Sequence, residues 1–147
     1  MKKMWILIFM VAALITAGCA GDDTGTTTFT DDDLEVTTNI PEGAEDQWCP
    51  VGTTWEAVNP QTGESMTMAI TGTETVNGIE MCKAIVEIEP VVDGIAKMEY
   101  LWAENGESVI WTNYDESGNV HSKITILDGK MSITDENGEV MEFGTTE

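Results

Sequence analysis

The chain has 147 residues, of which 27 are acidic and six are basic, and its formal net charge at pH 7 is −21. This balance excludes nucleic acid and anionic lipid headgroups as direct electrostatic partners. All six basic residues are lysines, His121 is the single histidine, and no Gly-rich phosphate loop occurs, so we predict neither an enzyme nor a cofactor or metal site.

Residues 1–18 have the three-part layout of an export signal. Met1–Lys3 carries positive charge, Met4–Ile15 is an apolar run without a charge, and small residues follow at 16–18. A helix over the apolar run would be about 18 Å long, well short of the ~30 Å hydrocarbon core of a bilayer. We therefore predict a signal peptide at 1–18 rather than a transmembrane helix.

The segment Ala17-Gly18-Cys19 resembles the lipobox of bacterial and archaeal lipoproteins, and we expect an archaeal one. Thr16 stands where the lipobox usually has Leu. The resemblance implies that Cys19 receives lipid, becomes the mature N-terminus and tethers the protein to the outer face of the cell membrane. Stable anchoring needs two lipid chains or a second attachment signal. The alternative is ordinary cleavage near Ala20, which would release a secreted protein.

Residues 19–45 are rich in Thr, Asp and Gly and poor in large apolar residues. Such a segment buries too little surface to offset its loss of conformational entropy, so we predict a flexible stalk. Asp31-Asp32-Asp33 is a candidate calcium ligand set within it. Because these residues lack the alternating acids and central Gly of an EF-hand loop, solvated acid is the favoured interpretation.

Cys49 and Cys82 remain once the leader and Cys19 are set aside. In an exported protein such an even pair predicts a disulfide. Closing a loop of about 34 residues would contribute ~3–4 kcal/mol in the chain-entropy treatment.

Residues 46–147 are predicted to form an antiparallel β domain. Turn pairs recur at 62–63, 77–78, 93–94, 105–106, 117–118, 128–129 and 137–138, and six of the seven pairs are Asn-Gly, Asp-Gly or Ser-Gly. Asn and Asp followed by Gly tolerate the positive φ angles of tight hairpins. The fold class predicted is therefore all-β, a single meander sheet of short strands, curved or half-barrel-like, after a signal helix and a disordered stalk.

Apolar and polar residues alternate between these turns, which predicts a sheet with one packed and one wet face. The apolar set is Met66, Met68 and Ile70; Cys82, Ala84, Val86 and Ile88; Ala96, Met98, Tyr100 and Trp102; Val109 and Trp111; Val120, Ile124 and Ile126; Met131 and Ile133; and Met141 and Phe143. The packed face needs a cover, which is the sheet's own curvature, a second sheet or a ligand.

Residues Ile70–Lys83, with Gly-Thr-Glu-x-Val leading into Asn77-Gly78, resemble a hairpin of lipoprotein-sorting and related envelope proteins. That resemblance implies a curved half-barrel whose concave face holds acyl chains or lipoproteins. By the same resemblance, the candidate apolar ligand face is Met66, Met68, Val86, Met98 and Trp102. A filled core without a cavity is the competing interpretation, and we favour it.

Four tryptophans lie in the predicted domain, at positions 48, 55, 102 and 111. Exposed on one sheet face they would bind sugar rings, whereas buried they belong to a core. Trp102 and Trp111 fall in phase with Met98 and Val109, so we expect core. His121 falls on the face of Lys123 and is expected at the surface.

Together these patterns predict an exported, lipid-anchored, acidic cell-surface β-domain protein with a non-enzymatic binding or envelope role. Its acidity is best explained by solubility in a salty medium, with cation binding and a cationic partner as the other two explanations. Carriage of a lipid or other apolar ligand in a half-barrel cavity is the first alternative function. A carbohydrate-binding or calcium-binding surface module is the second. Beyond the membrane reached through Cys19, no partner is predicted.

Overall fold

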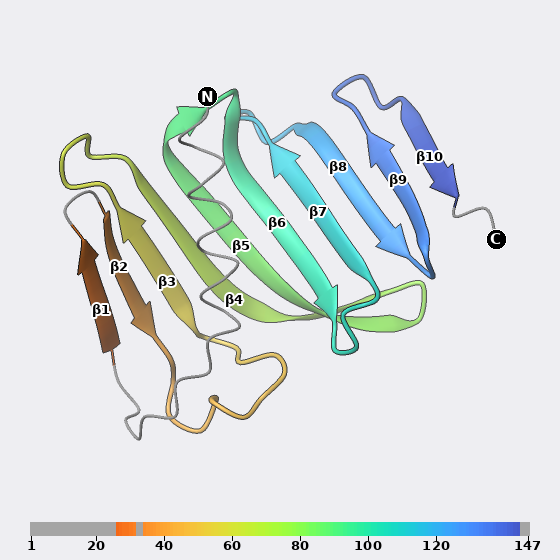
Figure 1. Ribbon diagram of the computed structural model, residues 1–147. Coiled ribbons are helices and arrows are strands. Elements are labelled where there is room, and N and C mark those ends of the chain that lie inside the picture. The colour runs from red at the N-terminus through yellow and green to blue at the C-terminus, as the bar shows by residue number, and fades with distance from the viewer. Residues whose placement is uncertain (1–25, 32–33, 145–147) are drawn as a thin grey trace.

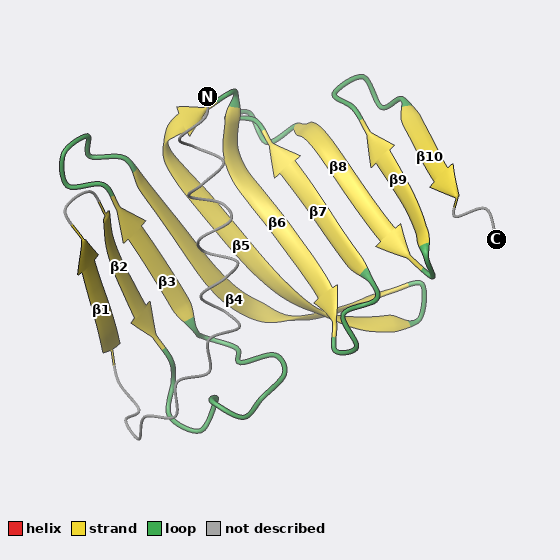
Figure 2. Ribbon diagram, viewed as in Figure 1, coloured by secondary structure: helices red, strands yellow, loops and turns green. Residues whose placement is uncertain are grey.

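The computed structural model describes residues 26–31 and 34–144, and these form one antiparallel sheet of ten strands. The strands lie side by side in chain order, so each pairs with its sequence neighbours (Figure 1). Their bounds are β1 (Thr26–Asp31), β2 (Leu34–Asn39), β3 (Thr54–Val58), β4 (Ser65–Val76), β5 (Ile79–Val92), β6 (Ile95–Ala103), β7 (Val109–Tyr114), β8 (Val120–Leu127), β9 (Lys130–Thr134) and β10 (Val140–Gly144). Figure 2 shows strands and loops, with no helix among the described residues. The predicted all-β meander is confirmed.

The predicted turns all fall in connections between consecutive strands. Asn77, Asp93 and Asp128 have φ angles of 51°, 52° and 51°, and each precedes a Gly with positive φ. Two consecutive positive φ angles match the right-handed twist of the strands they join, which is why Asn-Gly and Asp-Gly occupy these hairpins. The longer loops are held by a side chain instead. The Asp115 carboxylate accepts hydrogen bonds from the Ser117 and Asn119 N–H groups, and the Asp135 carboxylate accepts them from the Asn137 and Glu139 N–H groups.

The strand register places the alternating apolar side chains on one side of the sheet, which we call the apolar face. Residues that pair directly across strands share a face. Three rows run across the strands: Trp55, Met68, Val86 and Met98; Ile70, Ala84, Tyr100, Trp111, Ile124, Ile133 and Met141; and Cys82, Trp102, Val109, Ile126, Met131 and Phe143. The alternation predicted from the sequence is confirmed, with one exception. A register shift after Asn113 places Val120 opposite Tyr114, on the other face, so its predicted position is wrong.

The opposite side, the polar face, has a small core of its own at one end of the sheet. A bulge between Ile70 and Gly72 bends the β4–β5 hairpin, and Gly72 has a φ of 155°, which residues with a Cβ rarely adopt. Figure 1 shows the hairpin tip turning beneath β6 and β7. Met81 is completely buried there against Leu101 and Ile110, and the residues packed around them are Val76, Ile79 and Leu127. The expectation of a wholly wet second face is therefore wrong at this end.

The structure also differs from the stalk predicted over 19–45. Residues 26–31 and 34–39 are paired strands, and β2 pairs with β3 of the main sheet. Threonine is a good strand former, and Val36 and Ala44 supply buried apolar contacts at 8% and 4% exposure. The described domain therefore begins at Thr26, ahead of the predicted boundary at 46. Residues 19–25 and 32–33, like the predicted signal helix at 1–18, lie outside the described residues.

The sheet is curved and open. β1 and β10 lie at its two ends and are not paired with each other (Figure 1). Within the described residues, no segment forms a helix that would span a membrane.

Candidate functional site

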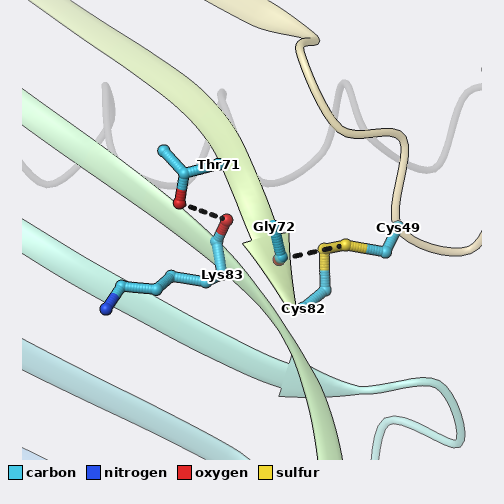
Figure 3. Close-up of a disulfide and its surroundings, with 5 residues drawn as sticks. All are labelled: Cys49, Thr71, Gly72, Cys82 and Lys83. Atoms are coloured by element: carbon cyan, nitrogen blue, oxygen red, sulfur yellow. Dashed lines mark hydrogen bonds between the residues drawn. A yellow bond between two sulfur atoms is a disulfide. The ribbon is translucent and has the colours of Figure 1, made fainter. Parts of the chain in front are cut away.

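A disulfide fixes the one long connection of the described chain onto the apolar face. Cys49 and Cys82 are joined, with their Cα atoms 5.4 Å apart, as the sequence predicts (Figure 3). Cys49 lies in residues 40–53, here called the covering loop, and Cys82 lies on β5 and is completely buried. Cys49 Sγ is also 3.4 Å from the Gly72 carbonyl oxygen, a contact without a proton because the sulfur is oxidised. The covering loop thus closes the apolar face near the β4–β5 bulge.

Two kinds of contact hold the covering loop in place. The C-terminal end of the covering loop pairs with β4 through two backbone hydrogen bonds of 2.9 Å. Gly52 N–H donates to the Ile70 carbonyl oxygen, and Ile70 N–H donates to the Thr53 carbonyl oxygen. Beneath it, the disulfide packs with Ile70 and Ala84. The partly buried side chains around that cluster are Trp48, Trp55, Met68 and Trp102. This is the principal core of the apolar face.

The structure brings the five candidate ligand-face residues onto the same face. Met68 pairs with Val86, and Val86 pairs with Met98, so these three form one row across β4, β5 and β6. Met66 lies one row away on β4, and Trp102 lies on β6 beside Cys82. Val86 and Met98 are buried at 6% and 9% exposure, whereas the other three are partly buried. Their role in holding a ligand stays a prediction.

An aromatic group adjoins this row. Tyr100 stacks on Trp102 with ring centroids 5.2 Å apart and meets Trp111 edge-on at 5.6 Å. Trp111 Nε1–H donates to Met98 Sδ at 3.4 Å. Burial raises the pKa of the Tyr100 hydroxyl, so the ring stays neutral. Each tryptophan of the described chain is partly buried, so Trp102 and Trp111 pack on the apolar face but are not among its fully buried core residues. Partial burial favours packing over an exposed sugar platform.

Beyond β7 the apolar face has no cover from the described residues. Apart from the covering loop, these residues are strands or the short turns that join them. Side chains on β8 and β9 such as Ile124 and Ile133 are partly buried, and the last strand exposes Met141 at 54% and Phe143 at 51%. From β8 to β10 the apolar face is therefore partly accessible and ends in two exposed large side chains, and hydrophobic surface of this kind marks an interaction site.

One polar position interrupts the apolar face. Asn113 pairs across the strands with Met98 and with Ser122, and its Nδ2 donates to the Ser122 hydroxyl at 2.8 Å. Among the described residues its Oδ1 is buried and has no hydrogen-bond partner. A buried acceptor without a donor is unfavourable, so this oxygen is an energetic weak point of the apolar face.

The charges lie on the other side. By the strand register, all four lysines of the described residues belong to the polar face. Lys83 Nζ lies 2.9 Å from a Glu99 oxygen and 3.0 Å from one of Glu74, and these carboxylates, Glu99 first, raise the pKa of the lysine. Lys97 Nζ lies 5.3 Å from the centre of the Tyr114 ring. The two longest rows of the apolar face contain no Asp, Glu, Lys or His, so this face suits an uncharged apolar ligand.

An open groove of about 1270 Å³ lies on the polar side, at the end of the sheet formed by β4 to β7. Its lining includes Thr67, Glu87, Lys97 and Tyr114, together with loop residues such as Asp115. None of the five candidate ligand-face residues lines it. The groove also reaches Ile88 and Ala96 of the predicted apolar set, so it lies at the edge of the apolar face rather than over the candidate ligand residues.

The remaining predicted site residues contribute no cluster. Cys19, Asp32 and Asp33 lie outside the described residues, and Asp31 ends β1. His121 lies at the β8 irregularity, partly exposed, with Nδ1 3.9 Å from a Glu136 oxygen. Across residues 26–31 and 34–144, no group of three or more His, Cys, Asp or Glu side chains is arranged to hold a metal ion.

Sequence reasoning missed Asn113, whose unpaired oxygen depends on its cross-strand neighbours. It also missed the hairpin that covers part of the polar face, although a Gly inside a strand pattern, here Gly72, is a signal for a bulge. No protein-family model, curated protein or solved structure was found that matches the chain.

Proposed function

We propose that the protein is an exported, lipid-anchored, non-enzymatic binding protein at the outer face of the cell membrane, and that its apolar face binds an acyl chain or similar apolar ligand. The observation that carries the ligand part is the apolar face of β8 to β10, which no described residue covers and where rows of large apolar side chains lie beside one another without a charged residue. Exposed apolar surface of this kind is typical of interaction sites and ligand-binding grooves.

The anchor part rests on the leader and on Cys19. Because the described domain starts at Thr26, only seven peptide steps separate it from Cys19, a reach of at most about 25 Å. A lipidated Cys19 would hold the sheet close to the membrane surface rather than on a long stalk. The ligand would then be taken from, or delivered to, the adjacent lipid.

Asn113 supports a ligand with one polar end. Its unpaired Oδ1 lies on the apolar face beside Met98 and the Ser122 hydroxyl. Once the side chains that cover this oxygen move aside, a hydroxyl donor at the ligand's end would satisfy it, and the chain would lie along the rows of β7 to β9. No cation lies on these rows, so a free carboxylate end group is disfavoured.

The binding test uses a long-chain alcohol that carries an environment-sensitive fluorophore, with the full chain in mild detergent. Ile133→Glu places a charge in the middle of the exposed apolar rows, and we expect at least a tenfold loss of affinity, since burying that charge costs more than about 1.4 kcal/mol. Thr134→Glu is the matched control, because it adds the same charge on the next residue, beside Lys123 on the polar face. Equal affinities in the two variants, or no binding by the unaltered chain, would reject the ligand site.

The anchor is tested separately by mass spectrometry of the protein isolated from membranes. A mature chain that begins at Cys19 and carries two or more acyl or alkyl groups supports the anchor. A chain beginning near Ala20 without lipid rejects it and leaves the ligand site unaffected.

A further inference from the structure

The two end strands of the sheet have free edges. β1 pairs with β2 on one side and β10 pairs with β9 on one side, and within the described residues no strand pairs with their outer edges. Each outer edge presents a row of backbone N–H and C=O groups that can pair with another strand. Residues 26–30 and every residue of β10 are exposed to solvent, so both edges are accessible.

Beyond the shortness of the two strands and Asp31 at the end of β1, the edges have little of the protection that usually prevents such pairing. Natural edge strands carry Lys, Pro or inward-pointing charges. In a chain in which 22% of residues are charged, β1 has one charged residue, Asp31 at its end, and β10 has one, Glu142. Both strands instead expose large apolar side chains: Phe29 is 59% exposed and Phe143 is 51% exposed.

The strand directions fit a head-to-tail contact. In an antiparallel meander of ten strands, the first and last strands run in opposite directions. A second copy displaced sideways, without rotation, therefore presents its β1 antiparallel to the β10 of the first copy. The apolar faces of the two copies then continue into each other, because a displacement does not turn the sheet over.

The side chains fit as well. Two registers pair all five residues of β10 with β1, and the one that keeps the apolar faces together places Met141 opposite Phe29 and Glu142 opposite Thr28 of the next copy. No two charges of the same sign are then opposite each other. The competing twofold pairing of β10 with β10, in its fully paired register, places Glu142 against Glu142, which is unfavourable. The strand directions allow head-to-tail pairing, and the charges favour it over pairing of β10 with itself.

We propose that β1 of one copy pairs with β10 of the next, so that copies of this chain assemble head to tail into an extended antiparallel sheet. The contact is heterologous, so it builds open chains of copies, or rings where the curvature of the sheet closes them. This inference does not depend on the apolar ligand or on the lipid anchor.

Disulfide trapping tests the contact in intact cells. Two tagged forms of the full chain are co-expressed, one with Thr28→Cys and the other with Glu142→Cys, and the cells are treated with a mild oxidant. We expect a cross-linked pair that carries both tags. When either variant is instead co-expressed with a tagged unaltered chain, no cross-linked pair should form. This control excludes cross-links through the native cysteines. Thr30→Cys with Val140→Cys, two pairs further along the same register, should give the same result.

Phe29→Lys tests the apolar part of the contact. A lysine directed onto the apolar face at this edge should reduce the cross-link yield about fivefold. Val51→Lys is the matched control, because Val51 is a similarly exposed apolar residue, at 49%, in the covering loop. Formation of the native Cys49–Cys82 disulfide verifies that each variant folds.

Three outcomes would overturn the proposal. A cross-link between two Glu142→Cys chains alone means that β10 pairs with itself. A third form of the chain carries both Thr28→Cys and Glu142→Cys. If it forms a cross-link within one chain and none between chains, the sheet closes on itself. No cross-link in either register pair, with the native disulfide intact, means that the edges do not meet.

Discussion

The covering loop should depend on its disulfide for most of its stability. Replacing Cys49 and Cys82 by Ala opens a loop closed over a sequence separation of 33 residues. The chain-entropy relation gives about 3.8 kcal/mol for a loop of this length. For a domain of this size, that loss lowers the Tm by roughly 10–20 °C. The measurement is the free energy of unfolding from urea titration, together with the Tm from circular dichroism.

Part of the loss in the double variant comes from deleted sulfur atoms, since Cys82 is completely buried. Reduction of the unaltered chain with dithiothreitol removes the cross-link and deletes no atoms, so it is the matched control. Trp48 and Trp55 pack against the disulfide cluster, and their emission should shift to longer wavelength in both samples as the loop loosens. A loss below about 1 kcal/mol in the reduced chain would refute the claim that the cross-link holds the loop.

Four further predictions follow from single residues. Lys83→Met should cost about 0.5–1 kcal/mol in urea unfolding at neutral pH. Glu99 and Glu74 raise the pKa of Lys83 above 10.5. The lysine's contribution to the free energy of unfolding is therefore present below pH 10.5 and is lost as the pH rises through the folded-state pKa. The Asn119 side chain lowers the pKa of Asp115 below 3.8. The stability that Asp115 contributes is therefore present above pH 3.8 and is lost as the pH falls through the lower folded-state pKa. Asp115→Asn should remove that part of the acid dependence of the urea midpoint. Asn113→Leu should weaken binding of the alcohol probe, because it removes the unpaired acceptor, but it also removes the donor to the Ser122 hydroxyl, so the free energy of unfolding should change by less than about 1 kcal/mol. Gly72→Val should cost about 1–3 kcal/mol in the same unfolding assay, because its φ of 155° strains any side chain.

Local chemistry made most of the sheet predictable. Asn77-Gly78, Asp93-Gly94 and Asp128-Gly129 fixed three hairpins through their positive φ angles, and apolar alternation then fixed the face on which each strand's large side chains lie. The disulfide was predictable because the leader pattern predicts export, and an even pair of cysteines in an exported chain is expected to be oxidised.

The errors came from features that alternation cannot reveal. β1 and β2 contain few large apolar residues, so their strand character rests on threonine and on pairing with β3. Val120 was placed on the wrong face because a register shift changes the phase. The bend at Gly72 required knowledge of the small apolar core beneath β6 and β7.

Methionine footprinting tests the central claim, that the exposed apolar face is the ligand surface, most directly. The full chain is oxidised with hydrogen peroxide, with and without the long-chain alcohol, and each methionine is quantified by mass spectrometry. We expect Met131 and Met141, on the uncovered apolar rows, to oxidise rapidly in the free chain and to be protected by the ligand, while the completely buried Met81 stays slow in both samples. Binding of the alcohol that leaves the oxidation of Met131 and Met141 unchanged would contradict the account.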